Sequence, residues 1–185
     1  EDQSGWQYDR SSEGWKALSR TAALCSCAEF KTGQEDVPIL EREVNGDGYE
    51  AALLRCVEMA AGDVQRWRFC NKKVCEIPFS SANQSQVSIH ETQDNKDPRY
   101  LLVMKGAPEI ILGCCSTIFM NGEEKPLDEE MKGVLNNALL KLRGLGECVL
   151  GFCDFMLPSD KYPLGYPFHP DSVNFPVHGL RFVGL

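Results

Sequence analysis

The chain has 185 residues, which is enough for one domain with its own hydrophobic core. Apolar residues make up 43% and charged residues 25%, values that are typical of a globular protein and exclude a disordered one. The net charge of −8 argues against a nucleic-acid-binding protein, because no basic stripe is present to displace counterions from phosphates. A phosphate-bearing ligand would have to be bound by a few local cations rather than by the field of the whole chain.

Nine cysteines are present, but their spacing does not match a zinc site. The pairs are Cys-x-Cys, Cys-Cys and two of Cys-x4-Cys, with no Cys-x2-Cys and only three histidines. An odd number of cysteines inside apolar runs favours reduced, mostly buried thiols in a cytosolic protein. The sequence shows neither a signal peptide nor an apolar run of about 18 residues, so we expect that the chain does not enter or span a membrane by itself.

The first predicted helix follows a polar N-terminal segment, residues 1–10, that we place outside the domain of residues 11–185. Ser11 or Ser12 is a suitable N-cap for this helix. Its apolar residues recur at helical spacing, and they are Trp15, Leu18, Ala22 and Cys25.

A loop and a second helix come next. Residues 32–37 are predicted as a loop and residues 38–40 as a short extended link. The turn-forming sequence Asn-Gly-Asp-Gly at 45–48 precedes a predicted helix. This helix covers residues 49–60 and ends at Gly62.

Period-two alternation of polar and apolar residues predicts a β-hairpin from Lys73 to His90, with its turn at residues 80–84. An exposed turn at 93–98 leads into a third, apolar strand at 100–104. The following residues, 107–114, are predicted as a helix that has a proline in its first turn, where a missing N–H costs nothing.

The C-terminal half continues the pattern of strands and helices. A strand at 117–120 and a tight Asn-Gly turn precede a long amphipathic helix that Asp128 caps and that ends at Gly144. Residues 148–156 are strand-like, 158–176 form a proline-rich surface loop, and 180–185 form a last strand. Strands joined by tight turns, with helices grouped around them, predict a single α+β domain with a largely antiparallel twisted sheet of about six or seven strands.

Five motifs, in order along the chain, carry a resemblance to a known family. They are Glu76-Ile-Pro-Phe79 with Gln86-Val-Ser-Ile-His90, Val103-Met-Lys-Gly-Ala-Pro-Glu109, Gly144-Leu-Gly-Glu147 with Val149-Leu-Gly-Phe-Cys153, Asn174-Phe-Pro176, and Phe182-Val-Gly-Leu185. With them the chain resembles the nucleotide-binding domain of P-type cation-transporting ATPases, above all the catalytic α subunit of the Na+/K+ and H+/K+ pumps. Together the motifs extend over nearly the whole chain.

The resemblance implies an adenine site around Phe79 and Lys105. From its period alone Phe79 would be a core residue, whereas in the family the equivalent ring stacks on adenine. Lys105 would lie at the floor of the pocket, with Gly106 and Ala107 beside it, although taken alone it could be a solvated strand end.

Polar residues complete the site that the resemblance implies. Glu50 would accept a hydrogen bond from the adenine amino group, and Gln86 would form a polar wall; the alternative for Glu50 is an exposed acid in the first turn of a helix. Asp47 and Tyr49 belong to the same motif, in which Tyr49 replaces a small hydroxyl residue and either crowds the pocket or adds an aromatic surface.

Three cations of the family are missing from this chain. Gln84, Ile110 and Cys148 stand where the family has basic residues, two of which, at Gln84 and Cys148, belong to the nucleotide site. Because a charge-assisted hydrogen bond contributes about 1.5–3 kcal/mol, we expect weak phosphate recognition, with adenine recognition retained.

No metal site is predicted. The spacing of Glu43, Asn45 and Asp47 resembles the start of a calcium loop, but its twelfth position is Leu54 rather than a bidentate glutamate. Thiol redox chemistry at Cys114, Cys115 or Cys148 lacks an activating histidine and is disfavoured.

The function implied is ATP binding without turnover. The phosphorylation motif Asp-Lys-Thr-Gly-Thr is absent, so a neighbouring domain would supply the aspartate nucleophile and the Mg2+, which only the parent enzyme needs. We expect an affinity on the order of millimolar, a monomeric fragment on the cytoplasmic side of a membrane, and contacts with the phosphorylation and actuator domains of a parent pump. The alternative is a divergent, non-catalytic interaction module that has lost nucleotide binding.

Overall fold

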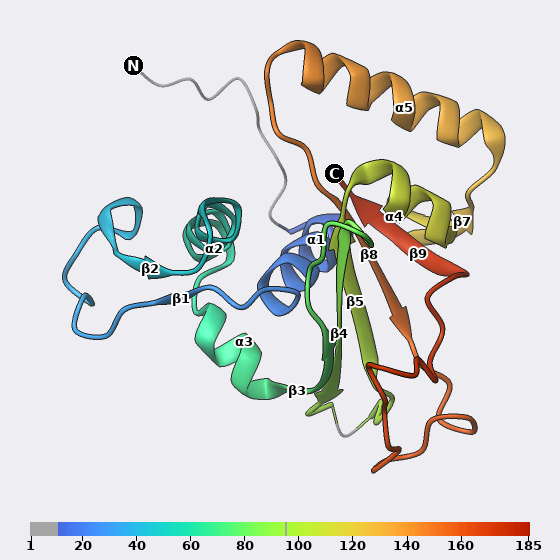
Figure 1. Ribbon diagram of the computed structural model, residues 1–185, viewed down its shortest axis with the longest axis horizontal. Coiled ribbons are helices and arrows are strands. Elements are labelled where there is room, and N and C mark those ends of the chain that lie inside the picture. Colours follow the sequence, from blue (N-terminus) through green and yellow to red (C-terminus); the bar gives the residue numbers. More distant parts are fainter. Residues whose placement is uncertain (1–10, 95) are drawn as a thin grey trace.

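A seven-stranded sheet forms the centre of the computed structural model, which describes residues 11–94 and 96–185 (Figure 1). The strands lie in the order β3-β4-β5-β8-β9-β6-β7. Neighbouring strands are antiparallel except β6 and β9, which are parallel. The bounds are β3 Asn71–Ile77, β4 Ser85–Thr92, β5 Leu101–Gly106, β6 Cys115–Met120, β7 Glu123–Pro126, β8 Gly151–Met156 and β9 Leu180–Gly184.

Helices lie on both sides of this largely antiparallel sheet. The helices are α1 Glu13–Leu24, α2 Gly48–Ala61, α3 Val64–Cys70, α4 Pro108–Cys114 and α5 Glu129–Gly144. The first three lie together beside one face, and α4 and α5 lie on the other side (Figure 1). The predicted α+β class and the largely antiparallel sheet are therefore confirmed.

Alternation along β5 divides the core into two layers. Leu102 and Met104 belong to the large cluster that also contains residues of α4, whereas Leu101 and Val103 pack against Leu24 at the end of α1. Both sets are fully or almost fully buried. Because side chains alternate between the faces of a strand, the next residue after Met104, Lys105, lies on the α1 face.

The predicted caps and turns are found in the structure, and Asp47 is a further cap that the sequence analysis did not assign. Ser12, Asp47 and Asp128 accept hydrogen bonds from the helix N–H groups three residues later, as N-caps do. Gly62, with φ of 68°, is the C-cap of α2. The turn between β6 and β7 consists of Asn121 and Gly122, both with positive φ, as a tight hairpin turn requires.

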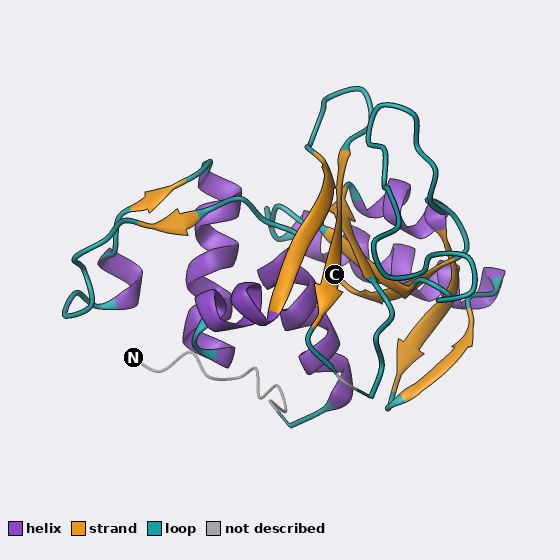
Figure 2. Cartoon of the chain, turned by 90° about the horizontal axis from the view of Figure 1, so that it is seen from below, coloured by secondary structure: helices purple, strands orange, loops and turns teal. Residues whose placement is uncertain are grey.

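Three local predictions are wrong or incomplete. Residues 38–40 are not an extended link, because the carbonyl of Pro38 accepts from Glu41 and closes a short 3₁₀ helix at Ile39–Glu41. Helix α3 and the small sheet of β1 (Glu29–Phe30) and β2 (Val44–Asn45) were not predicted. Figure 2 shows this two-stranded sheet apart from the main sheet, beyond the helices.

The proline-rich loop after β8 is more than a surface connection. It carries four aromatic rings that contact one another at centroid distances of 5.0 to 6.1 Å and pack against the large core cluster. They are Tyr162, Tyr166, Phe168 and Phe175. Such clusters of rings fix a loop that has no regular secondary structure.

All nine cysteines are free thiols, and five of them are buried. Among the described residues no helix is both long and apolar enough to cross a membrane. The predicted N-terminal segment, residues 1–10, lies outside the described residues.

A tight contact at Gly106 joins β5 to the start of β4. A Cβ at this position would lie 2.3 Å from the carbonyl oxygen of Gln84 and 2.8 Å from the Cα of Ser85. The backbone N–H of Ala107 also donates to the Gln84 carbonyl, at 2.9 Å. Only glycine allows this approach, so Gly106 holds the end of the hairpin against β5.

We predict that Gly106→Ala lowers the free energy of unfolding by about 1–3 kcal/mol. The added Cβ would clash with backbone atoms of Gln84 and Ser85, which cannot move away without moving the rest of the strand. Gly113→Ala is the matched control, since Gly113 lies in α4 with nothing within 4 Å of its added Cβ. That change stabilises by up to about 1 kcal/mol through helix propensity. Urea unfolding of both variants measures the difference, and equal midpoints would contradict the contact.

Candidate functional site

The register of three strands brings polar side chains together on the α1 face of the sheet. Gln86 on β4 lies opposite Lys105 on β5, and Glu76 on β3 lies opposite Ser88 on β4. Directly paired residues point to the same face of a sheet. The polar groups of β3, β4 and β5 thus form one cluster near the end where the hairpin turns.

A buried ion pair joins this cluster to α2. The Nζ atom of Lys105 lies 2.6 Å from Oε1 of Glu50, and the two side chains are only 6% and 12% exposed. The Glu50 carboxylate also accepts the backbone N–H of Cys27, at 3.1 Å from Oε2. Neither charge would be stable at this depth without its partner. Glu50 is therefore a buried partner of Lys105 and not an exposed acid in the first turn.

Asp47 acts through the helix rather than through a direct contact with the cluster. Its carboxylate accepts the N–H of Glu50 at 2.9 Å and caps α2. This cap begins the helix at Gly48, which places Glu50 in the first turn, facing the sheet. In this structure Asp47 is a residue that positions Glu50.

Glu76 is the centre of a second group of hydrogen bonds that the sequence analysis did not assign to the site. Its Oε1 accepts from Nε2 of Gln86 at 2.7 Å and from the thiol of Cys27 at 3.0 Å, and its Oε2 lies 3.0 Å from Nζ of Lys73. Burial would raise the pKa of Glu76, but hydrogen bonds from Cys27, Lys73 and Gln86 outweigh it and lower the pKa. Glu76 is thus an anion that fixes the amide of Gln86.

The Cys27 thiol stays protonated in this environment. Burial and its hydrogen bond to the Glu76 carboxylate raise the pKa of Cys27, although Lys73 acts in the opposite direction. Since the thiolate is the reactive form, Cys27 serves here as a hydrogen-bond donor rather than a nucleophile.

Phe79 lies at the open end of the same hairpin. It follows the last residue of β3, Ile77, which pairs with Val87 next to Gln86. Its side chain is 57% exposed, so the interpretation of Phe79 as a core residue is wrong. An exposed aromatic ring at this place is available as a stacking surface.

The loop that carries Phe79 is fixed at its base. Gln84 has a left-handed backbone with φ of 51°, and its N–H donates to the carbonyl of Ser80 at 2.7 Å. The Gln84 carbonyl accepts from Ala107, so Gly106 and Ala107 support the loop from below. The Gln84 side chain itself is exposed.

Tyr49 and Cys148 lie at the surface, outside the buried hydrogen-bonded cluster. Both are exposed, and both line an apolar groove of about 800 Å³ between α1, α2 and the segment before β8. Leu53 and Leu145 also line it, and Glu147 is its only charged residue among those that the structure describes. Its described lining contains no lysine or arginine.

Metal-ligand geometry is absent from the described part of the chain, where no three His, Cys, Asp or Glu side chains come close enough to hold an ion. Asp47, part of the calcium-like spacing, uses its carboxylate to cap α2. The described residues of the candidate site therefore do not fit a Mg2+ site.

With this fold and site, the comparison with known proteins is specific. The chain belongs to the family described as P-type ATPase, cytoplasmic domain N, whose model matches residues 14–185. Over all 185 residues it is 68% identical to the sodium/potassium-transporting ATPase subunit alpha of Drosophila melanogaster, 63% identical to subunit alpha-B of Artemia franciscana and 57% identical to subunit alpha-3 of Homo sapiens. The chain covers 18% of the length of each of these relatives. The resemblance inferred from the five motifs is confirmed.

We predict that the buried pair of Lys105 and Glu50 is strongly coupled. Lys105→Met and Glu50→Gln each lower the free energy of unfolding by about 3–5 kcal/mol, because each leaves a buried polar group without its partner. The loss in free energy of unfolding of the double variant is smaller than the sum of the two single losses by at least about 1.5 kcal/mol. Urea unfolding of the four proteins gives this coupling energy.

The exposed pair of Lys132 and Glu129 on α5 is the control for this cycle, with side chains 35% and 90% exposed. Its coupling energy stays below about 1 kcal/mol. Equal coupling in the two cycles would show that Lys105 and Glu50 are solvated and do not form a buried pair.

Proposed function

We propose that this chain binds ATP by its adenine end and presents the phosphates to another domain of a longer P-type pump. The observation that carries the proposal is the exposed ring of Phe79, at the same end of the sheet as Gln86 and Lys105. Stacking of a base on an aromatic ring contributes about 1–3 kcal/mol, a large part of the affinity of a weakly held nucleotide.

The polar cluster offers groups that recognise the edge of adenine. Gln86 donates its amide N–H to Glu76, which leaves its carbonyl oxygen as an acceptor for the adenine amino group. Lys105 has three donors and uses one for Glu50, so the others remain for acceptors on the ligand. Glu50 is held in place by Lys105 and Cys27, and in this proposal it accepts from the amino group with a remaining lone pair.

The phosphate end would be held weakly. Gln84 and Cys148 are exposed neutral residues, and Ile110 is an exposed apolar one, at the three positions where the family has cations. ATP, ADP and adenosine are therefore expected to bind with similar affinity, on the order of millimolar. A nucleotide held only by its base leaves the γ-phosphate free for a phosphorylation domain that supplies the aspartate and the Mg2+.

In the proposed parent pump, this domain would lie on the cytoplasmic side, in contact with the phosphorylation and actuator domains. The relatives are named as sodium/potassium-transporting subunits, and we propose the same ions for the parent of this chain. The isolated chain is expected to bind nucleotide without hydrolysing it.

The first test is a titration with ATP, adenosine and GTP, followed by amide chemical shifts. We expect shifts at the ends of β4 and β5 with the adenine ligands, and their loss in Phe79→Ala. The matched control is Phe69→Ala, which removes a ring on α3 that is 77% exposed and leaves the shifts unchanged. Equal effects of the two variants, or no shifts with any nucleotide, would favour the non-catalytic interaction module.

A gain of affinity tests the role of the missing cation. We predict that Cys148→Arg tightens ATP about ten-fold or more and leaves adenosine unchanged, because an added charge-assisted hydrogen bond reaches only the phosphates. Cys56→Arg, in the same apolar groove, controls for a nonspecific effect of charge. Equal tightening by both variants would contradict a phosphate position beside Cys148.

A further inference from the structure

A second hollow, on α1, α3 and β9, shares no residue with the proposed nucleotide site. It has a volume of about 760 Å³, within the range of sites for small ligands. We call it the basic hollow, because its lining includes four cationic residues against two acidic ones in a chain whose net charge is −8. The cations are Lys16, Arg20, Arg66 and Arg181, and the acids are Glu13 and Asp63.

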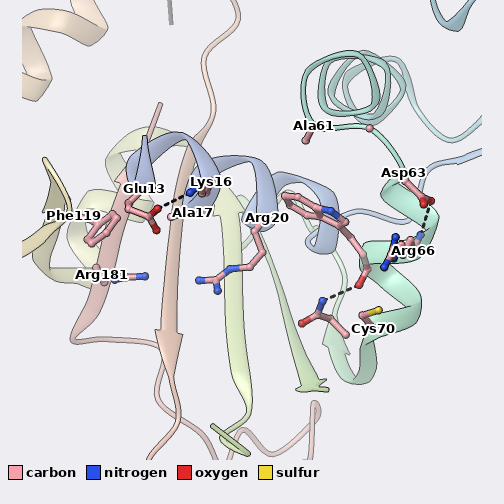
Figure 3. Close-up of a pocket in the computed structure, with 13 residues that line it drawn as sticks. Glu13, Lys16, Ala17, Arg20, Ala61, Asp63, Arg66, Cys70, Phe119 and Arg181 are labelled. Carbon is pink, nitrogen blue, oxygen red and sulfur yellow. Dashed lines mark hydrogen bonds and ion pairs between the residues drawn. The ribbon is translucent and has the colours of Figure 1, made fainter. Parts of the chain in front are cut away.

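One buried carboxylate serves two of these arginines. Asp154 on β8 is 1% exposed and accepts from Arg20 at 2.9 Å and from Arg181 at 2.8 Å through two nitrogens. Two guanidinium groups thus share one negative charge, and one positive charge remains uncompensated. Figure 3 shows Arg20 and Arg181 pointing toward each other at one side of the hollow.

The orientation of Arg181 is fixed and Arg20 has an unused donor. The Arg181 guanidinium lies over the ring of Phe119, at 4.4 Å from its centroid. The Nε of Arg20 is buried and has no hydrogen-bond partner among the described residues. A buried donor without a partner costs free energy.

The opposite side contributes a cation that has no anion bound to it. Arg66 on α3 is exposed, and within residues 11–94 and 96–185 its guanidinium makes no hydrogen bond or ion pair. The Asp63 carboxylate is used to cap α3 by accepting the backbone N–H of Arg66 at 3.0 Å. Among the described residues, Lys16 forms an ion pair with the exposed Glu13, and such pairs are weak enough to open for a ligand.

We propose that the basic hollow binds an organic phosphate with at least two phosphate groups. One group lies between Arg20, Arg181 and Lys16, and a second reaches Arg66 on the other wall. Arginine is suited to this role because its planar fork donates two parallel hydrogen bonds to phosphate oxygens. The half-buried indole of Trp67 lines the space between and would contact the apolar part of the ligand.

The test uses the whole 185-residue chain and two probes. Inositol hexakisphosphate represents a free organic phosphate, and phosphatidylcholine vesicles with and without phosphatidylinositol bisphosphate represent a lipid headgroup. With the soluble probe we expect shifts of the α1 and α3 amides and of the Trp67 indole N–H, whether or not Phe79 is replaced by alanine. Arg66→Gln and Lys16→Gln each weaken binding about ten-fold.

Lys132→Gln is the matched control, because it removes one positive charge from an exposed pair of the same i,i+3 spacing on α5. It should leave affinity within about two-fold, as expected for a screened distant charge. Binding to the soluble probe would identify the ligand of the basic hollow as a free organic phosphate. Binding only to the phosphoinositide vesicles would identify it as a lipid headgroup. No binding to either probe, shifts confined to the residues around Phe79, or equal losses in Arg66→Gln and Lys132→Gln would overturn the proposal.

Discussion

The candidate nucleotide site depends on the buried pair of Lys105 and Glu50. Lys105 is the last charged residue of β5, and Glu50 stands in the first turn of α2, so the pair joins the main sheet to the helices beside it. The Asp47 cap and the Cys27 N–H hold Glu50 in place, and the β4–β5 register sets Gln86 beside Lys105. A cation buried at this depth requires a paired anion, and the contacts of Glu50 hold that anion in place.

The strands, most helices and their caps were predictable from sequence because they depend on local period and on single capping residues. The exposure of Phe79 was predictable only from the family motif, since alternation alone assigns it to the core. The group around Glu76 was missed because the Cys27 thiol reaches it from the segment that follows α1, whereas Lys73 lies on the same strand as Glu76. No sequence spacing reveals both contacts. The 3₁₀ helix at Ile39–Glu41 was missed because three residues carry no periodic signal.

Positive charge is distributed unevenly in this acidic chain. The apolar groove beside Tyr49 and Cys148 has no lysine or arginine in its described lining, whereas the basic hollow has four cationic residues. Both surfaces include residues of α1, which therefore separates two environments of opposite character. A polyanion near this domain would be attracted to the hollow and not to the groove, because local cations rather than net charge decide where phosphates bind.

The position of β9 has a consequence for how the chain assembles. Although β9 is the last strand in the sequence, it lies between β8 and β6 and carries the one parallel pairing of the described sheet. Until residues 180–184 have left the ribosome, the β6–β7 hairpin has no neighbour in the sheet and β8 has an open edge. Such edges pair readily with other chains. Completion of the sheet is thus delayed until β9 has been synthesised, and until then these two edges stay unpaired.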